Sequence, residues 1–107
     1  MSALLPQPLQ EFIKKYPDIW QAYENLGDKC HEAGPLDEKT RRLVKLGIAI
    51  GARLEGAVHS HTKRALEAGI SEEEILHVAL LAITTIGFPS TIAATIWIKD
   101  VLKKKKK

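Results

Sequence analysis

The sequence predicts an all-α fold of five or six helices joined by short links. Apolar residues recur every three or four positions between Gly and Pro breaks, and no segment shows the strict alternation of a strand. The chain has 107 residues, of which 45 % are hydrophobic and 27 % charged, as in an ordinary globular domain. We therefore expect one domain overall, with N-terminal helices in residues 1–33, a helical core in residues 34–102 and a lysine tail in residues 103–107.

Two helices are predicted before the core. The first covers residues 7–16 and ends before Pro17, and the second runs from Asp18 to Ala33, where Gly34-Pro35 stops it. Apolar side chains of the second helix share one face: Ile19, Trp20, Tyr23, Leu26 and Cys30. Because Cys30 lies on that face, we expect a buried structural thiol.

The core begins with a long helical pattern. Asp37 is a suitable N-cap, the pattern continues to Ala68, and Gly69 suits the position after the helix. This length exceeds a typical helix, and the segment contains three glycines, so we expect a break near residues 51–55.

A capping box, Ser71-x-x-Glu74, begins the next predicted helix, which ends at Gly87. Pro89 then suits the first turn of the last helix. Residues 75–98 contain no Asp, Glu, Lys or Arg and could span a bilayer, but Gly87-Phe88-Pro89 divides them. We expect two helices buried in a core or a subunit interface, and no membrane partner.

Charge and cysteine content exclude several classes of function for this chain. Five of the 16 basic residues form the terminal lysine run. The rest of the chain has 11 basic and 13 acidic residues, so its formal net charge is −2. The body is thus not a nucleic-acid surface. One cysteine excludes a disulfide scaffold and a four-cysteine zinc site. The start of the chain lacks a signal-peptide pattern, so we expect a cytoplasmic location.

Three segments, residues 34–44, 61–75 and 87–89, resemble the carboxymuconolactone decarboxylase family of the alkylhydroperoxidase-D-like fold in order and spacing. The resemblance implies an all-helical subunit that assembles into homo-oligomers, as trimers or hexamers. It also implies a small pocket near His61 and no cofactor.

Members of this family perform either of two chemistries. One is peroxide reduction by a Cys-x-x-Cys pair, but Leu54 and Ala57 stand at the cysteine positions here and Arg42 stands at the relay glutamate. Without those thiols we expect no dithiol peroxidase activity. A one-cysteine peroxidase that uses Cys30 is the last-ranked alternative.

The other chemistry is cofactor-independent decarboxylation of a small acid. Its members carry a carboxylate two residues before the histidine and a tyrosine two before the glycine of Gly-x-Pro, where this chain has His59 and Thr85. We expect His61 to act as general acid or base, since its unperturbed pKa near 6.5 allows both forms at neutral pH. Arg42 is a candidate for binding a substrate carboxylate. The other candidates for substrate binding are Glu55, His59 and Thr85.

The residues also permit less chemical interpretations. His61 lies in an apolar stripe and could be a structural histidine, and Glu55 and His59, one turn apart, could simply pair in water. A metal site formed by Glu55, His59 and His61 is badly spaced, because His59 and His61 leave a helix about 200° apart, so we expect no metal. The main alternative to a decarboxylase-like enzyme is a non-catalytic oligomeric member of the family.

Overall fold

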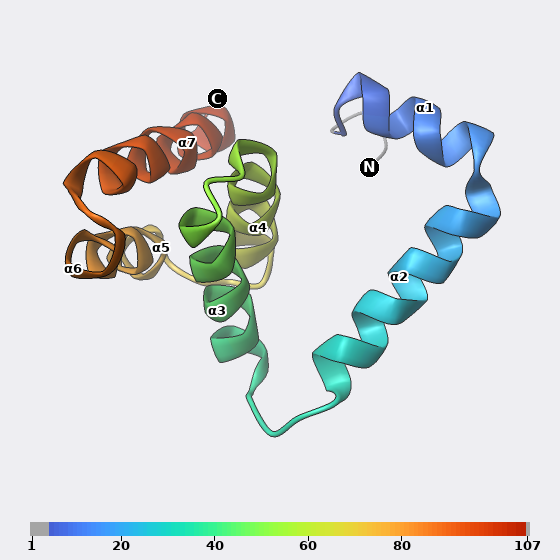
Figure 1. Ribbon diagram of the computed structural model, residues 1–107, viewed down its shortest axis with the longest axis horizontal. Coiled ribbons are helices and arrows are strands. Elements are labelled where there is room, and N and C mark those ends of the chain that lie inside the picture. The colour runs from blue at the N-terminus through green and yellow to red at the C-terminus, as the bar shows by residue number, and fades with distance from the viewer. Residues whose placement is uncertain (1–4, 107) are drawn as a thin grey trace. The chain divides into compact units, whose positions relative to one another are not determined.

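The computed structural model describes residues 5–106, with side chains up to Lys104, and contains no strand within that range. Seven helical segments follow one another (Figure 1): α1 Gln7–Lys15, α2 Pro17–Glu32, α3 Glu38–Gly51, α4 Glu55–Glu67, α5 Glu72–Leu81, α6 Ile83–Ile86 and α7 Phe88–Lys106. The prediction of an all-α fold is confirmed. The count exceeds the predicted five or six because a turn at Ala82 separates the short α6 from α5.

The described chain divides into two compact units at Pro35 and Leu36. In the first unit, α1 and α2 meet at Pro17, the first residue of α2, and the rings of Phe12 and Tyr16 lie 5.2 Å apart. Neither helix contains a buried residue. On the predicted apolar face of α2, Trp20 is half-buried, and the other members are exposed: Ile19, Tyr23, Leu26 and Cys30. The expected burial of Cys30 is therefore wrong.

The second unit has a continuous hydrophobic core. Helix α4 packs against α3 on one side and α7 on the other, and α5 also packs against α7. Each of these four helices contributes fully or almost fully buried aliphatic side chains to the core: Leu46 and Ile50, Val58 and Ala65, Ile75 and Ala79, and Ala94 and Ile98. The α3–α4–α7 packing positions the polar groups described below.

The break predicted near residues 51–55 lies at Ala52–Leu54, between α3 and α4. Arg53, rather than a glycine, takes the left-handed conformation there, with φ of 58°. A non-glycine residue in this region carries a cost of about 1–2 kcal/mol. The Arg53 side chain donates a 2.7 Å hydrogen bond from Nη1 to Ser90 Oγ, which links the turn to the start of α7.

The predicted breaks around α5 are also present. Ser71 Oγ accepts a hydrogen bond from the Glu74 backbone N–H at 3.1 Å, and Glu74 Oε1 accepts from the Ser71 N–H at 3.0 Å, so the capping box is complete. Gly87 takes a positive φ of 100° between α6 and α7 and divides the uncharged stretch. Within the described residues, no helix is long and apolar enough to cross a membrane.

Glu74 gives the fold a testable dependence on pH. A hydrogen-bonded contact with Lys39 of α3, followed by hydrogen bonds with Ser71, lowers the pKa of Glu74 from 4.5 to about 2. A carboxylate whose pKa is lower in the folded than in the unfolded chain stabilises the fold at pH values above its unfolded pKa of 4.5. This contribution is lost as pH falls through the folded pKa of about 2. We therefore expect Glu74→Gln to lower Tm at pH 7 and to have a much smaller effect at pH 2, where about half of the Glu74 carboxyl is protonated, as measured by circular dichroism.

The matched control is Glu73→Gln, because Glu73 is exposed in the same first turn of α5. Its Tm difference from the wild type should stay smaller and change less with pH. A Glu74→Gln difference that is constant between pH 7 and pH 2 would contradict the role of the ionised carboxylate.

Candidate functional site

His61 lies in the second turn of α4, beside the buried residues Val58, Thr62 and Ala65 of the same helix. Its side chain is half-buried. Its Nδ1 atom is fully buried and has no hydrogen-bond partner among the described residues. A buried polar atom without a partner is costly and therefore needs an explanation, such as an ordered water or a role in the chemistry of a site.

Burial is the largest cause that lowers the pKa of His61 below 6.5. The nearby positive charges of Arg64, Lys45 and Arg42 lower it further, in that order. The free protein therefore holds a neutral imidazole at pH 7, with one nitrogen able to accept a proton. Two helices supply the surrounding charge, because Arg42 and Lys45 are one turn apart on α3 and Arg64 lies on α4.

Glu38, the first residue of α3, holds two arginines of that helix. Its Oε2 accepts a 2.8 Å hydrogen bond from Arg42 Nε, and its Oε1 accepts a 3.1 Å bond from Arg41 Nη2. The Nε atom of Arg41 is buried without a partner in the described structure. An arginine fixed through Nε presents its remaining N–H groups in a defined direction, as recognition of a carboxylate requires.

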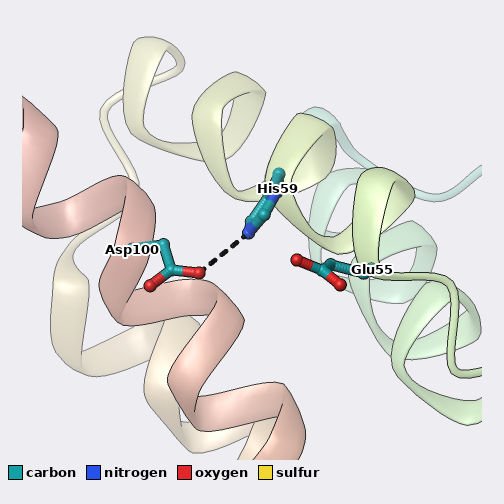
Figure 2. A group of neighbouring side chains, drawn as sticks. All are labelled: Glu55, His59 and Asp100. Atoms are coloured by element: carbon teal, nitrogen blue, oxygen red, sulfur yellow. Dashed lines mark hydrogen bonds and ion pairs between the residues drawn. The ribbon is translucent and has the colours of Figure 1, made fainter. Parts of the chain in front are cut away.

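Glu55 and His59 form a different group, with Asp100 of α7 (Figure 2). His59 Nε2 lies 3.2 Å from Asp100 Oδ2, and the ligand atoms of the three side chains all lie within 4.8 Å of one another. His59 and His61 are two residues apart and leave α4 about 200° apart. The sequence candidates thus divide between two faces of α4, with Arg42 near His61 and Glu55 near His59.

The hydroxyl of the candidate residue Thr85 makes a hydrogen bond within the protein. Thr85, on α6, is exposed and donates a 3.2 Å hydrogen bond to the Leu81 carbonyl, as helical threonines often do. Ser90 accepts the hydrogen bond from Arg53.

Sequence reasoning did not identify three of the charged residues in these groups. Lys45 and Arg64 each lie three positions after a predicted site residue, so helical spacing from Arg42 and His61 could have found them. Asp100 carries no such signal, because its partner is 41 positions away and the contact depends on how α7 packs on α4.

The family model for the carboxymuconolactone decarboxylase family matches residues 17–100. An uncharacterized protein of Methanocaldococcus jannaschii is 33 % identical over 102 residues, which cover 94 % of this chain and 95 % of that protein. Nitrosuccinic acid decarboxylase npaB of Metarhizium robertsii is 39 % identical over 61 residues, which cover 57 % of this chain and 43 % of that protein.

A solved structure shows the same fold. The crystal structure of a carboxymuconolactone decarboxylase family protein from Legionella pneumophila superposes with a TM-score of 0.76, at 23 % identity, over 90 % of this chain and 86 % of that one. The family model alone covers well over half of the chain. The resemblance seen in the sequence is confirmed, and the chain belongs to the carboxymuconolactone decarboxylase family.

Proposed function

We propose that this protein is a decarboxylase-like enzyme that acts on a small carboxylated molecule, with His61 as its general acid–base group and no cofactor. The observation that carries the proposal is the buried, unpartnered Nδ1 of His61 among the charges of Arg42, Lys45 and Arg64. A half-buried imidazole near several cations suits a substrate with more than one negative charge.

The chemistry follows from the charge that decarboxylation creates. When the C–C bond to the carboxylate breaks, CO₂ leaves and the electron pair remains on carbon, where an adjacent carbonyl or nitro group can accept it. The cations near His61 would stabilise the resulting oxyanion, and an imidazolium would then donate its proton to the carbon. The reaction consumes one proton, which the histidine takes from water.

Substrate binding would also change the protonation of His61. In the free protein, burial and then the three positive charges lower its pKa, so the ring is neutral at pH 7. A bound dianion would offset those charges and raise the pKa of the imidazole. The histidine would therefore gain its proton as the substrate binds.

The relative with a named activity supports a small acid as substrate. Nitrosuccinic acid, in the name of the Metarhizium robertsii protein, is a dicarboxylic acid whose nitro group can accept an electron pair on the adjacent carbon. That chemistry matches a site with several cations. We therefore choose nitrosuccinate and 3-oxo dicarboxylic acids as test substrates.

We expect the wild-type protein to release CO₂ from at least one of these acids, detected together with the product by NMR. Arg42→Gln should raise KM about 10–100-fold, because a hydrogen bond to a charged group contributes about 1.5–3 kcal/mol. Lys103→Gln, which removes a charge from an exposed position of α7, is the control with unchanged KM. Absence of CO₂ release from every acid, or an unchanged KM in Arg42→Gln, would contradict the proposal.

A non-catalytic oligomeric protein is the second candidate, and one observation favours assembly in either case. Phe88, Ile92 and Ile96 recur every four residues on α7 and are all exposed, opposite the buried face that contains Ala94 and Ile98. Such a stripe is typical of a subunit interface. We propose a homo-oligomer, either a trimer or a hexamer, whose interface includes this surface.

The one-cysteine peroxidase remains the last-ranked candidate function, because the exposed Cys30 would need a reductant from outside the chain.

A further inference from the structure

Three side chains with metal-binding atoms converge where α4 packs against α7 (Figure 2). Glu55 and His59 are four residues apart on α4, so they lie one above the other on the same face. Asp100 reaches the same point from α7, and its Oδ2 lies 3.2 Å from His59 Nε2. The site is on a different face of α4 from His61 and does not depend on the proposed decarboxylase activity.

We propose that Glu55, His59 and Asp100 bind one divalent transition-metal ion, for which Zn²⁺ is the test case. The sequence predicts no metal, because the group of Glu55, His59 and His61 is badly spaced; the structure brings Asp100, not His61, to Glu55 and His59. With Asp100 as the third residue, the spacing objection disappears, because the two residues that share α4 are now four apart. Two ligands at this spacing plus a third from another element is a common way to hold zinc.

The distances fit an ion with small adjustments. Ligand atoms in a tetrahedral zinc site lie about 2.0–2.2 Å from the ion and thus roughly 3.3–3.6 Å from one another. His59 Nε2 and Asp100 Oδ2, at 3.2 Å, are slightly closer than this, and all three ligand atoms lie within 4.8 Å of one another. Glu55 is exposed, so rotation of its side chain is unhindered by core packing.

The donor set favours a transition metal over Mg²⁺ or Ca²⁺. Those hard cations prefer oxygen ligands alone, whereas an imidazole nitrogen suits zinc and its neighbours in the first row. Three protein ligands also leave one position for water. The side chains of His59 and Asp100 are 33 % and 44 % exposed, so an ion can enter from solvent.

An ordinary surface ion pair is the competing explanation for the contact between His59 and Asp100. It involves two of the three side chains and leaves out the second carboxylate, Glu55, whose ligand atom lies within 4.8 Å of the same atoms. Two carboxylates at that separation repel each other weakly in water, and a cation bound between them would turn this repulsion into attraction. A divalent ion supplies that charge and binds both.

The experiment uses the full chain in a Cys30→Ser background, because the exposed thiol would compete for zinc. After treatment with chelator, Zn²⁺ is titrated by calorimetry, and Co²⁺ is added to record its visible spectrum. We expect one ion per chain and a Co²⁺ spectrum typical of four or five ligands. Asp100→Asn and His59→Asn should each weaken zinc binding at least about tenfold.

The chain provides a matched control in α5. His77 follows Glu73 by four residues on an exposed face, as His59 follows Glu55, but no third ligand joins that pair among the described residues. His77→Asn should therefore leave the zinc affinity unchanged. Equal affinity in Asp100→Asn, His59→Asn and the parent protein would identify the zinc as an adventitious ion only and overturn the proposal.

A second measurement separates loss of the site from loss of the fold. Because the ligands come from two helices, Zn²⁺ should raise the Tm of the parent protein and of His77→Asn. It should not raise the Tm of Asp100→Asn, whose helical circular dichroism should match that of the metal-free parent. An equal zinc-induced Tm rise in Asp100→Asn would also overturn the proposal.

Discussion

Replacing His61 with asparagine should lower kcat for any acid that the wild-type protein decarboxylates by about 100- to 10,000-fold, the range for loss of general acid–base catalysis. Asparagine keeps a polar side chain of similar reach but cannot carry the proton. His61 is half-buried and its Nδ1 makes no hydrogen bond in the described structure, so the fold does not rely on that atom. Tm and subunit mass should therefore stay close to those of the wild type.

The pH profile gives this variant a second readout. The pKa of His61 is lowered below 6.5, first by burial and then by Arg64, Lys45 and Arg42, so the imidazolium becomes populated in the free protein only as pH falls through that lowered value. We expect kcat/KM of the wild type to rise between pH 8 and pH 6, and the slope to disappear in His61→Asn. The free energy of unfolding should change in the opposite direction to the activity as pH falls. Because the unfolded chain binds this proton more readily than the folded one, protonation of His61 destabilises the fold below pH 6.5.

The control is His77→Asn, since His77 is exposed on α5 and outside both polar groups. Its activity should equal that of the wild type. If His61→Asn instead melts much earlier and dissociates into subunits, the histidine is structural and the assignment of the site is wrong.

The helical pattern was predictable because local chemistry determines it. Gly34-Pro35, the Ser71–Glu74 capping box and Gly87 each act through their own backbone geometry or hydrogen bonds, and each is found at a helix boundary. The position of the break between α3 and α4 was predictable, but the residue that takes the unusual backbone conformation there was not. Arg53 rather than a glycine takes the left-handed conformation there, and its side chain reaches Ser90, 37 residues away.

Contacts between distant segments were not predictable from spacing. The sequence places Glu55 and His59 one turn apart, but only the packing of α7 on α4 brings Asp100 to them. The charges around His61 were partly predictable, since Arg64 lies one turn along the same helix, whereas the approach of Arg42 and Lys45 depends on the packing of α3. The exposure of Cys30 was also not predictable from spacing. The helical pattern places Cys30 on an apolar face, but it does not specify which segment, if any, packs against that face.

The second large effect that we expect is the dissociation of the homo-oligomer by a single substitution in α7. Each chain has a mass of 11.9 kDa, so light scattering of the wild type should return about 36 kDa for a trimer or about 71 kDa for a hexamer. Ile96→Glu should reduce this to about 12 kDa at micromolar concentration. Ile96 is 54 % exposed and is the last residue of the apolar stripe on α7, one turn after Ile92. A carboxylate buried there without a partner costs several kcal/mol, and the symmetry of a homo-oligomer repeats that cost in every subunit.

The variant should remain helical, because Ile96 lies outside the buried core to which Ala94 and Ile98 contribute on the opposite side of α7. Glu67→Lys, a change of charge at an exposed position of α4, should retain the wild-type mass and serves as the control. A wild-type mass near 12 kDa would show that the stripe is not an interface between copies. An oligomer that persists in Ile96→Glu would place the interface elsewhere, and the uncovered face of α2, with Ile19, Tyr23 and Leu26 each more than half exposed, would then be the next surface to substitute.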